Sequence, residues 1–252
     1  MDEPYKLFLD IETRPNLGWT WAKWETNVIE FEKHWSILSF SAKWDGGEHI
    51  TKGLPNYRGY KKGSDDDEQI VRHLWKLLDR AAIIIMQNGD KFDVRKMNAR
   101  FVYYGIPPPS PYRTVDTLKV ARKYFAFDSN KLDDMGEFLG LGRKMKHEGF
   151  DTWKGCMLGD RHAWSIMLKY NRRDVVLLER IYKRFLPWIA NHPNVGMWNI
   201  GSCCPKCGSQ NLVSRGYQRY KTTKYRSVQC RDCGGYSRTT FNEQENKPLV
   251  GI

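Results

Sequence analysis

Four acidic residues stand out because their spacing places carboxylates on separate predicted elements. Asp10 and Glu12 are two positions apart, and on a β-strand this spacing aims both side chains at the same side. Asp93 follows an apolar segment and its loop, and Asp174 lies in a long helical pattern one turn after Tyr170. Hard cations take oxygen ligands, and two ions about 3.5–4 Å apart can activate a water and stabilise a leaving oxygen. The four acids therefore indicate a site for two Mg²⁺ or Mn²⁺ ions.

A second set of candidate metal ligands lies near the C-terminus, where five of the six cysteines fall in the last fifty residues. Two Cys-x-x-Cys pairs, 22 residues apart, each present two thiolates, and together they complete a tetrahedral Zn²⁺ site. The predicted ligands are Cys204, Cys207, Cys230 and Cys233. Because all four ligands are cysteines, the site is closed and structural, and Cys203 is surplus to it.

Tyrosines alternate with basic residues between the two cysteine pairs. Residues 201–240 hold eight basic groups and one acid, a net charge of +7, whereas the first 190 residues hold 32 basic and 26 acidic groups. Basic side chains bind phosphates and aromatic rings stack on bases, so this segment predicts a nucleic-acid surface. Its residues are Arg215, Tyr217, Arg219, Tyr220, Lys221, Lys224, Tyr225 and Arg226. The alternative is a solvated hairpin with a few packed tyrosines.

Periodicity predicts the elements that must position these groups. Strands are predicted over residues 5–12, 34–44, 48–54, 81–86 and 113–118, with Asp45-Gly46-Gly47 as a hairpin turn. Helices are predicted to open at residues 64–68 and to run over 94–104, 132–139 and 160–185. This order predicts an α/β fold with a mixed β-sheet flanked by helices, followed by a small β module.

The change in composition along the chain predicts its domains. We expect a catalytic domain over residues 1–190, a linker over 191–200, a zinc ribbon over 201–242 and a tail over 243–252.

Three further features have two interpretations each. The acidic run at residues 64–68 is a metal cluster or a capped helix N-terminus, and capping is favoured. Five tryptophans within 26 residues stack on bases or pack the early strands, and packing is favoured for most of them. They are Trp19, Trp21, Trp24, Trp35 and Trp44. Asp116 supports the metal site or ends a strand.

Three segments resemble the sequence motifs of the DEDD, or DnaQ-like, 3′–5′ exonucleases. They are FLDIET at residues 8–13, NGDKFD at 88–93 and YNRRD at 170–174. The resemblance covers roughly residues 5–190. The family's His branch would place a histidine five residues before Asp174, where this sequence has Lys169, so the chain resembles the Tyr branch (DEDDy).

The resemblance implies a ribonuclease H-like fold and two-metal hydrolysis at the 3′ end of a nucleic acid. It implies that Asp10, Glu12, Asp93 and Asp174 hold the metals and that Tyr170 helps to orient the attacking water. Two other functions compete with this one. A structure-specific endonuclease on the same fold would generally take its glutamate from a helix, and a non-catalytic nucleic-acid-binding protein need not keep all four acids.

The net charge of +12 and the pI near 9.4 favour a polyanionic partner. We expect nucleic acid, with DNA favoured over RNA, and replication or repair proteins as further partners. No run approaches 18 consecutive apolar residues and the first ten residues show no secretory signal, so we expect no membrane association and a cytoplasmic location.

Overall fold

The computed structural model describes residues 6–24, 27–143, 149–198, 201–246 and 249–250. The chain forms two compact units, here called the body (Tyr5–Ile181) and the C-terminal unit (Met1–Pro4 with Tyr182–Ile252). The domain boundaries expected from the sequence stay predictions. Residues 199–200 of the expected linker and 247–248 and 251–252 of the expected tail lie outside the described residues.

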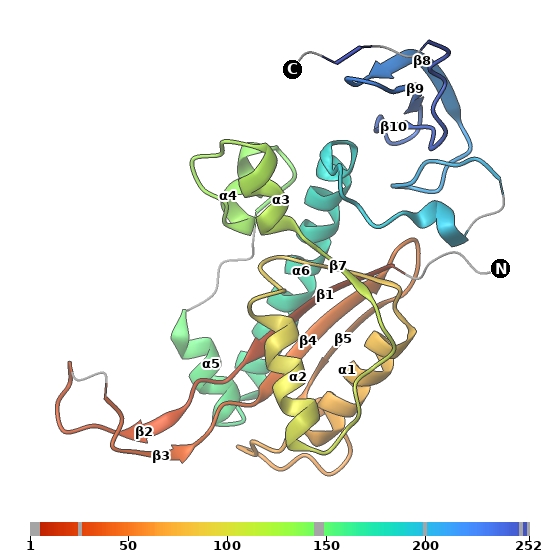
Figure 1. Ribbon diagram of the computed structural model, residues 1–252. Coiled ribbons are helices and arrows are strands. Elements are labelled where there is room, and N and C mark those ends of the chain that lie inside the picture. Colours follow the sequence, from red (N-terminus) through yellow and green to blue (C-terminus); the bar gives the residue numbers. More distant parts are fainter. Residues whose placement is uncertain (1–5, 25–26, 144–148, 199–200, 247–248, 251–252) are drawn as a thin grey trace. The chain divides into compact units, whose positions relative to one another are not determined.

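A five-stranded mixed sheet forms the centre of the body (Figure 1). Its order is β5-β4-β1-β6-β7, with β1 (Lys6–Thr13), β4 (Ile37–Trp44), β5 (His49–Gly53), β6 (Ile83–Met86) and β7 (Arg113–Asp116). Strand β1 pairs antiparallel with β4 and parallel with β6, so the strand that carries Asp10 and Glu12 lies where the sheet changes direction. The parallel strands β1, β6 and β7 therefore end at one common edge.

Helices cover both faces of this sheet, with α6 on one face and α1 and α2 on the other (Figure 1). The body helices are α1 (Glu68–Arg80), α2 (Asp93–Tyr103), α3 (Thr117–Tyr124), α4 (Leu132–Phe138), α5 (Phe150–Met157) and α6 (Arg161–Phe185), of which α6 continues into the C-terminal unit. A 3₁₀ turn, η1 (Leu54–Asn56), follows β5. The period-two pattern of β1 sends Leu7, Leu9 and Ile11 into the core cluster that α1 and α2 share, which leaves Asp10 facing α6.

The α/β class with a mixed sheet is confirmed, and two differences from the predicted elements have clear causes. The strand predicted over residues 113–118 ends at Asp116, whose carboxylate accepts a 3.0 Å hydrogen bond from the Leu118 amide and so caps α3. Helix α5 was not predicted, because its eight residues, FDTWKGCM, carry only a weak helical pattern.

A hairpin that the sequence did not predict follows β1. It consists of β2 (Leu17–Trp19) and β3 (Glu30–Lys33), which pair with each other and with no other strand among the described residues, and it extends away from the sheet (Figure 1). The expectation that most of the clustered tryptophans pack the early strands is wrong for three of them. Trp19, Trp21 and Trp24 are 63%, 85% and 86% exposed, because the hairpin offers no apolar layer for them to pack against.

The acidic run lies at the start of α1, as predicted, and Asp66 accepts a 3.0 Å hydrogen bond from the amide of Glu68, the first helical residue. Asp67 is fully buried, and its carboxylate forms an ion pair with Arg100 and accepts hydrogen bonds from the Tyr104 hydroxyl and the Ile37 amide, at 2.7 and 2.8 Å. Its side chain makes no cap hydrogen bond to α1. Within the run, the Asp67 side chain therefore does not cap the helix but joins α2 to β4 in the interior.

The C-terminal unit is built around a three-stranded antiparallel sheet of order β10-β9-β8. Its elements are β8 (Leu212–Arg219), β9 (Lys224–Cys230) and β10 (Tyr236–Arg238), preceded by the 3₁₀ turns η2 (Leu186–Trp188) and η3 (Val195–Trp198). Together with its four clustered cysteines, this small sheet is compatible with a zinc ribbon. None of the helices in the described parts of the chain is long and apolar enough to span a membrane.

Candidate functional site

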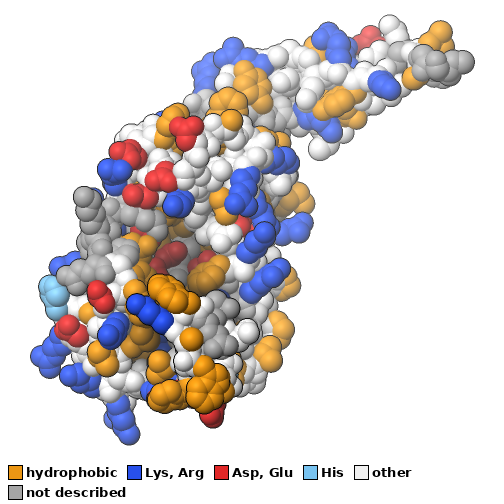
Figure 2. Space-filling view, turned by 90° about the vertical axis from the view of Figure 1, so that its left-hand side faces the viewer, with side chains coloured by type: hydrophobic (Ala, Val, Ile, Leu, Met, Phe, Trp, Pro, Cys, Tyr) orange, Lys and Arg blue, Asp and Glu red, His pale blue; other side chains and the backbone are white. Residues whose placement is uncertain are grey.

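The carboxylates of Asp10, Glu12 and Asp174 lie together, with one ligand oxygen of each within 4.8 Å of the others. The central strand β1 supplies two of these acids, and α6, which covers one face of the sheet, supplies Asp174. Three converging carboxylates form an all-oxygen donor set, which fits Mg²⁺ or Mn²⁺ and would be repulsive without a cation. The structure therefore brings three of the four predicted acidic ligands into one group. Acidic side chains also lie set back in a hollow of the body (Figure 2).

Asn171 fixes this group, and the sequence analysis did not single it out. It is fully buried, and its amide nitrogen donates to the Asp10 carboxylate at 2.6 Å and to the Asp10 carbonyl at 3.3 Å. Its amide oxygen accepts from the Ser39 hydroxyl of β4 at 3.3 Å. The available signal was the spacing, since an amide three residues before Asp174 shares its helix face.

Asp93 is not among the acids whose carboxylate oxygens lie within 4.8 Å of one another. It is the first residue of α2, is 3% exposed, and its Oδ1 accepts a 3.0 Å hydrogen bond from the amide of Ile11, the residue between Asp10 and Glu12. Burial raises the pKa of Asp93 to about 7, opposed by this hydrogen bond and aided by the nearby charge of Asp116. In this structure Asp93 supports the backbone of the first motif, and its role as a metal ligand stays a prediction.

Asp116 organises the loop before α2. Its two carboxylate oxygens accept hydrogen bonds from the amides of Asn88 and Asp90, at 2.9 and 3.4 Å, as well as capping α3. Asn88 has a φ of +59°, a left-handed conformation that asparagine tolerates better than most residues. Asp116 thus ends a strand, and it also holds the loop that leads into Asp93.

Tyr170 is 9% exposed and packs edge-on against Trp153 of α5, with ring centroids 6.0 Å apart. The packing orients the ring on the same helix as Asp174, one turn earlier. This placement is compatible with either a catalytic hydroxyl or a packed aromatic residue, so the role of Tyr170 in orienting water stays a prediction.

Positive charge borders the sheet face that α6 covers. Lys43 of β4 forms a 2.5 Å ion pair with Glu179, which is 7% exposed. Burial, together with the positive charges of Arg172 and Lys43, lowers the pKa of His49 to about 4. The Lys43–Glu179 pair ties α6 to β4 beyond the acid group, and His49 stays neutral at physiological pH.

The four predicted zinc ligands converge in the C-terminal unit. The four sulfurs all lie within 4.8 Å of one another; they belong to Cys204, Cys207, Cys230 and Cys233. The sulfurs of Cys204 and Cys233 are 3.6 Å apart, as are those of Cys207 and Cys230. Tetrahedral Zn²⁺ with Zn–S bonds of about 2.3 Å separates its sulfurs by roughly 3.8 Å, so the donor set fits zinc.

The two cysteine turns have matching backbones. The amides of Gly208 and Gly234 donate to the carbonyls of Cys204 and Cys230, at 2.9 and 3.0 Å, and both glycines have φ near +80°. A side chain would strain this conformation, which explains the glycine after each pair. Burial opposes ionisation of the Cys230 thiol, but the amides of Cys233 and Asp232 and the neighbouring thiols outweigh it and lower its pKa to about 7. One ligand is therefore ready to bind a metal as thiolate near neutral pH.

The predicted nucleic-acid residues line the β8–β9 hairpin, where cations gather on aromatic rings. Lys224, Arg219 and Arg226 lie 4.6, 5.8 and 5.8 Å from the Tyr217 ring. Tyr220 packs edge-on against Tyr225 at 5.8 Å, and Arg238 lies 3.9 Å from the Tyr225 ring.

Other basic residues of the C-terminal unit differ in their surroundings. Arg215 donates to Gln229 at 2.9 Å, Arg226 also pairs with Glu243 at 3.2 Å, and Lys221 is exposed. Lys206, counted with the basic groups above, is instead buried against the Pro187 carbonyl, so it adds no surface charge.

A solved structure of the family B DNA polymerase from the hyperthermophilic archaeon Pyrobaculum calidifontis is similar, with a TM-score of 0.56 and 14% sequence identity over 74% of this chain. The match covers 25% of the polymerase chain, and at this identity it shows a shared fold. A search of curated proteins finds no match. The RNase H superfamily model RNase_H_2 matches residues 7–186, which hold the three-acid group and its supports. The chain therefore belongs to the RNase H superfamily, a nuclease superfamily.

Proposed function

We propose that this protein is a metal-dependent 3′–5′ exonuclease of the DEDDy type that releases nucleoside 5′-monophosphates, with single-stranded DNA as the favoured substrate. The observation that carries the proposal is the convergence of Asp10, Glu12 and Asp174 within 4.8 Å. The motif order and the tyrosine one turn before Asp174 support the exonuclease assignment within the RNase H superfamily.

Asp10, Glu12 and Asp174 would hold two Mg²⁺ or Mn²⁺ ions, with Asp93 as the fourth acid of the set. When bound, such ions supply an activated water and stabilise the charge on the leaving oxygen. The protein's own residues set the geometry. Asn171 holds Asp10 through its carboxylate and its carbonyl, and Asp93 holds the amide between Asp10 and Glu12.

Tyr170 would orient the attacking water through its hydroxyl. The ring packs against Trp153, so the side chain would lose little conformational entropy when its hydroxyl binds the water.

The C-terminal unit would bind substrate without contributing chemistry. A single Zn²⁺ at the four cysteines would stabilise the β8–β9 hairpin, on which Arg219, Lys221 and Lys224 would meet phosphates and Tyr217, Tyr220 and Tyr225 would meet bases. Its net basic charge complements a polyanion, and the clustered acids of the body repel one until cations bind.

The test uses three substrates of one sequence: a 3′-labelled strand, a 5′-labelled strand and a covalently closed single-stranded circle, each with Mn²⁺ or EDTA. The proposal predicts immediate release of the 3′ label as a mononucleotide, a ladder shortening by single nucleotides from the 5′-labelled strand, and an intact circle. Cutting of the circle would instead assign an endonuclease. The same assay with RNA separates DNA from RNA preference.

The role of the hairpin has its own test. Replacing Arg219, Lys221 and Lys224 together by alanine should raise KM and lower the log–log salt slope of binding by roughly 0.7 for each phosphate contact that is lost. The matched control replaces three exposed body lysines, Lys76, Lys123 and Lys154, and should leave the slope closer to that of the wild type. Equal effects of both triple variants would mean that the hairpin contributes only general charge.

A further inference from the structure

One face of α2 carries a row of aromatic and basic side chains that starts beside Asp93. Phe92, which immediately precedes the helix, is followed by Lys96, Arg100 and Tyr103 at helical spacing. Phe92 is 39% exposed and Tyr103 is 70% exposed, which is unusual for large rings on a helix that also contributes to the core. From Asp93 to Tyr103 the row spans about 15 Å, a length that several stacked nucleotides cover at roughly 3.4 Å each.

Trp35, from the segment that joins β3 to β4, completes the row between the two cations. The Lys96 ammonium lies 3.7 Å from the centroid of the Trp35 ring and 5.8 Å from that of Phe92. The Arg100 guanidinium lies 5.8 Å from Trp35 and 4.3 Å from Tyr103. Lys96 forms no ion pair within the described parts of the chain, so its charge is available to an anion.

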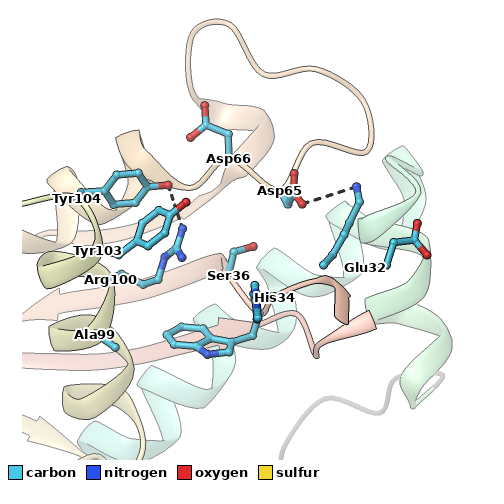
Figure 3. A pocket seen from close by; sticks show the side chains of 11 residues that line it. Glu32, His34, Ser36, Asp65, Asp66, Ala99, Arg100, Tyr103 and Tyr104 are labelled. Carbon is cyan, nitrogen blue, oxygen red and sulfur yellow. Dashed lines mark hydrogen bonds and ion pairs between the residues drawn. The ribbon is translucent and has the colours of Figure 1, made fainter. Parts of the chain in front are cut away.

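A cavity of about 800 Å³ opens beside this row, within the roughly 300–1,000 Å³ of small-ligand pockets. Tyr103, Tyr104 and Arg100 form one wall, and Asp65 and Asp66 lie across from them (Figure 3). The cavity also borders β3, so the exposed tryptophan hairpin starts at its rim.

Three acidic residues line this cavity: Asp65 and Asp66 have the partners given next, and Glu32 of β3 is exposed. Asp65 forms ion pairs with Arg14 and Lys33, both at 3.6 Å, and Asp66 accepts from the Glu68 amide at 3.0 Å. The buried carboxylate of Asp67 forms an ion pair with Arg100 and accepts a hydrogen bond from the Tyr104 hydroxyl. The charges of Asp65 and Asp67 are therefore balanced by cations, and the Lys96 ammonium, which is in no ion pair within the described parts of the chain, lies beside the aromatic rings.

We propose that this α2 face and Trp35 form a binding track for an unpaired nucleic-acid strand. Bases stack on Phe92, Trp35 and Tyr103, and a backbone phosphate binds Lys96. Stacking tolerates any sequence because every base has a π-face, whereas a duplex keeps its base faces covered. The track rests on the proposed function, in which Asp93 is the fourth acid of the metal site and Phe92 directly precedes it. The track specifies the substrate as single-stranded.

The experiment measures binding by fluorescence anisotropy in EDTA, so that no hydrolysis is needed. The ligands are a labelled single strand of DNA, the same strand in RNA and a blunt DNA duplex. Tyr103→Ala and Lys96→Gln remove a ring and a charge from the track. Val102→Ala, at an 80% exposed neighbour outside the row, and Lys76→Gln, on α1, are the matched controls. Because Tyr103 is exposed, Tyr103→Ala should keep the wild-type unfolding temperature.

The proposal predicts that Tyr103→Ala weakens single-strand binding on the order of tenfold. Lys96→Gln should weaken it and lower the salt slope by roughly 0.7, while both controls bind like the wild type. A loss with DNA, RNA or both supports the track and identifies the strand that it binds.

The track is overturned if both variants bind single strands like their controls, if the wild type binds the duplex equally well, or if it binds none of the ligands. Hydrolysis by the wild type is assayed separately with Mn²⁺. If the wild type is inactive but the variants bind single strands more weakly than it does, the proposed nuclease function is refuted and the binding track is supported. An active wild type with unaffected variants would refute only the track.

Discussion

The side-chain amide of Asn171 donates a 2.6 Å hydrogen bond to the carboxylate of Asp10, and so ties α6 to β1 at the acid group. The Ser39 hydroxyl, 3.3 Å from the Asn171 amide oxygen, supports the opposite side of the same amide. Asp10 is thereby held in place before any cation binds. Groups that hydrogen-bond to a metal ligand commonly orient it in this way.

Replacing Asn171 by leucine should weaken Mn²⁺ binding by about 10- to 100-fold, because Asp10 loses the group that orients it. The variant should also lose about 1 kcal/mol of stability, since the part-buried carboxylate and carbonyl of Asp10 lose a donor. Thermal unfolding at increasing Mn²⁺ concentrations measures both effects. Ser39→Ala is the matched control, because it loosens the amide and leaves its bond to Asp10 in place. Equal metal affinity in Asn171→Leu and Ser39→Ala would show that Asn171 does not position Asp10.

Asp93 should make the stability of the metal-free protein depend on pH. Its pKa is about 7 in the folded state against 3.8 for an ordinary aspartate, so the native state holds a proton that the unfolded chain releases. The stability from this group is therefore fully present below about pH 4 and is lost as the pH rises through 7. Asp93→Asn cannot titrate and keeps an oxygen for the Ile11 amide.

Urea unfolding in EDTA between pH 4 and 8 checks this expectation. The wild type should lose stability relative to Asp93→Asn as the pH rises, and Asp128→Asn, at an exposed carboxyl, should follow the wild type. Parallel pH profiles for the wild type and Asp93→Asn would contradict a raised pKa at Asp93.

The regular elements were predictable because burial imposes a period on them. Strand β1 and helix α6 show apolar periods of two and of about 3.6, and the structure has both within one residue of the predicted bounds. Period alone also placed Asp10 and Glu12 on one strand face. The contact between Asn171 and Asp10 could not be predicted in the same way. Asn171 is followed by two arginines on α6, and its position in the sequence does not distinguish a buried amide from an exposed one.

The hairpin and the acidic run show where composition misleads. Tryptophan is usually buried, yet Trp21 and Trp24 are exposed because their segment forms an isolated two-stranded ribbon. Asp67 follows a pattern typical of helix caps, but Arg100 and Tyr104, distant in sequence, draw its carboxylate into the interior. The exposure of the tryptophans and the burial of Asp67 both depend on which distant segments pack against them, and local sequence does not show this.

Tyr170→Phe separates a catalytic hydroxyl from a packed ring. The phenyl ring keeps the contact with Trp153, so the fold should be unchanged. If the hydroxyl orients the attacking water, kcat should fall with little change in KM, because the interaction matters in the transition state. Steady-state kinetics on a 3′-labelled single strand measure both constants. A wild-type kcat in Tyr170→Phe would assign the tyrosine to packing alone.

Zinc should be bound once per chain at the four cysteines. Cys230→Ser should abolish stoichiometric zinc in purified protein and destabilise the C-terminal unit, because a site with three sulfurs no longer closes a tetrahedron. Cys203→Ser is the matched control, since Cys203 lies next to a ligand but outside the group of four. Metal analysis by mass spectrometry gives the ratio. Loss of zinc in Cys203→Ser with retention in Cys230→Ser would contradict the ligand assignment.

An active site at the three acids is tested most directly by the rate at which Asp174→Asn releases the 3′-terminal nucleotide from a labelled single strand in saturating Mn²⁺. Asp174 is 1% exposed and is the member of the acid group that α6 contributes. The control is Asp151→Asn, at an exposed carboxyl on α5. Loss of a carboxylate from the metal site is expected to slow release on the order of 10³-fold, equivalent to several kcal/mol, while the control keeps the wild-type rate. Equal rates for Asp174→Asn, Asp151→Asn and the wild type would contradict an active site at these acids.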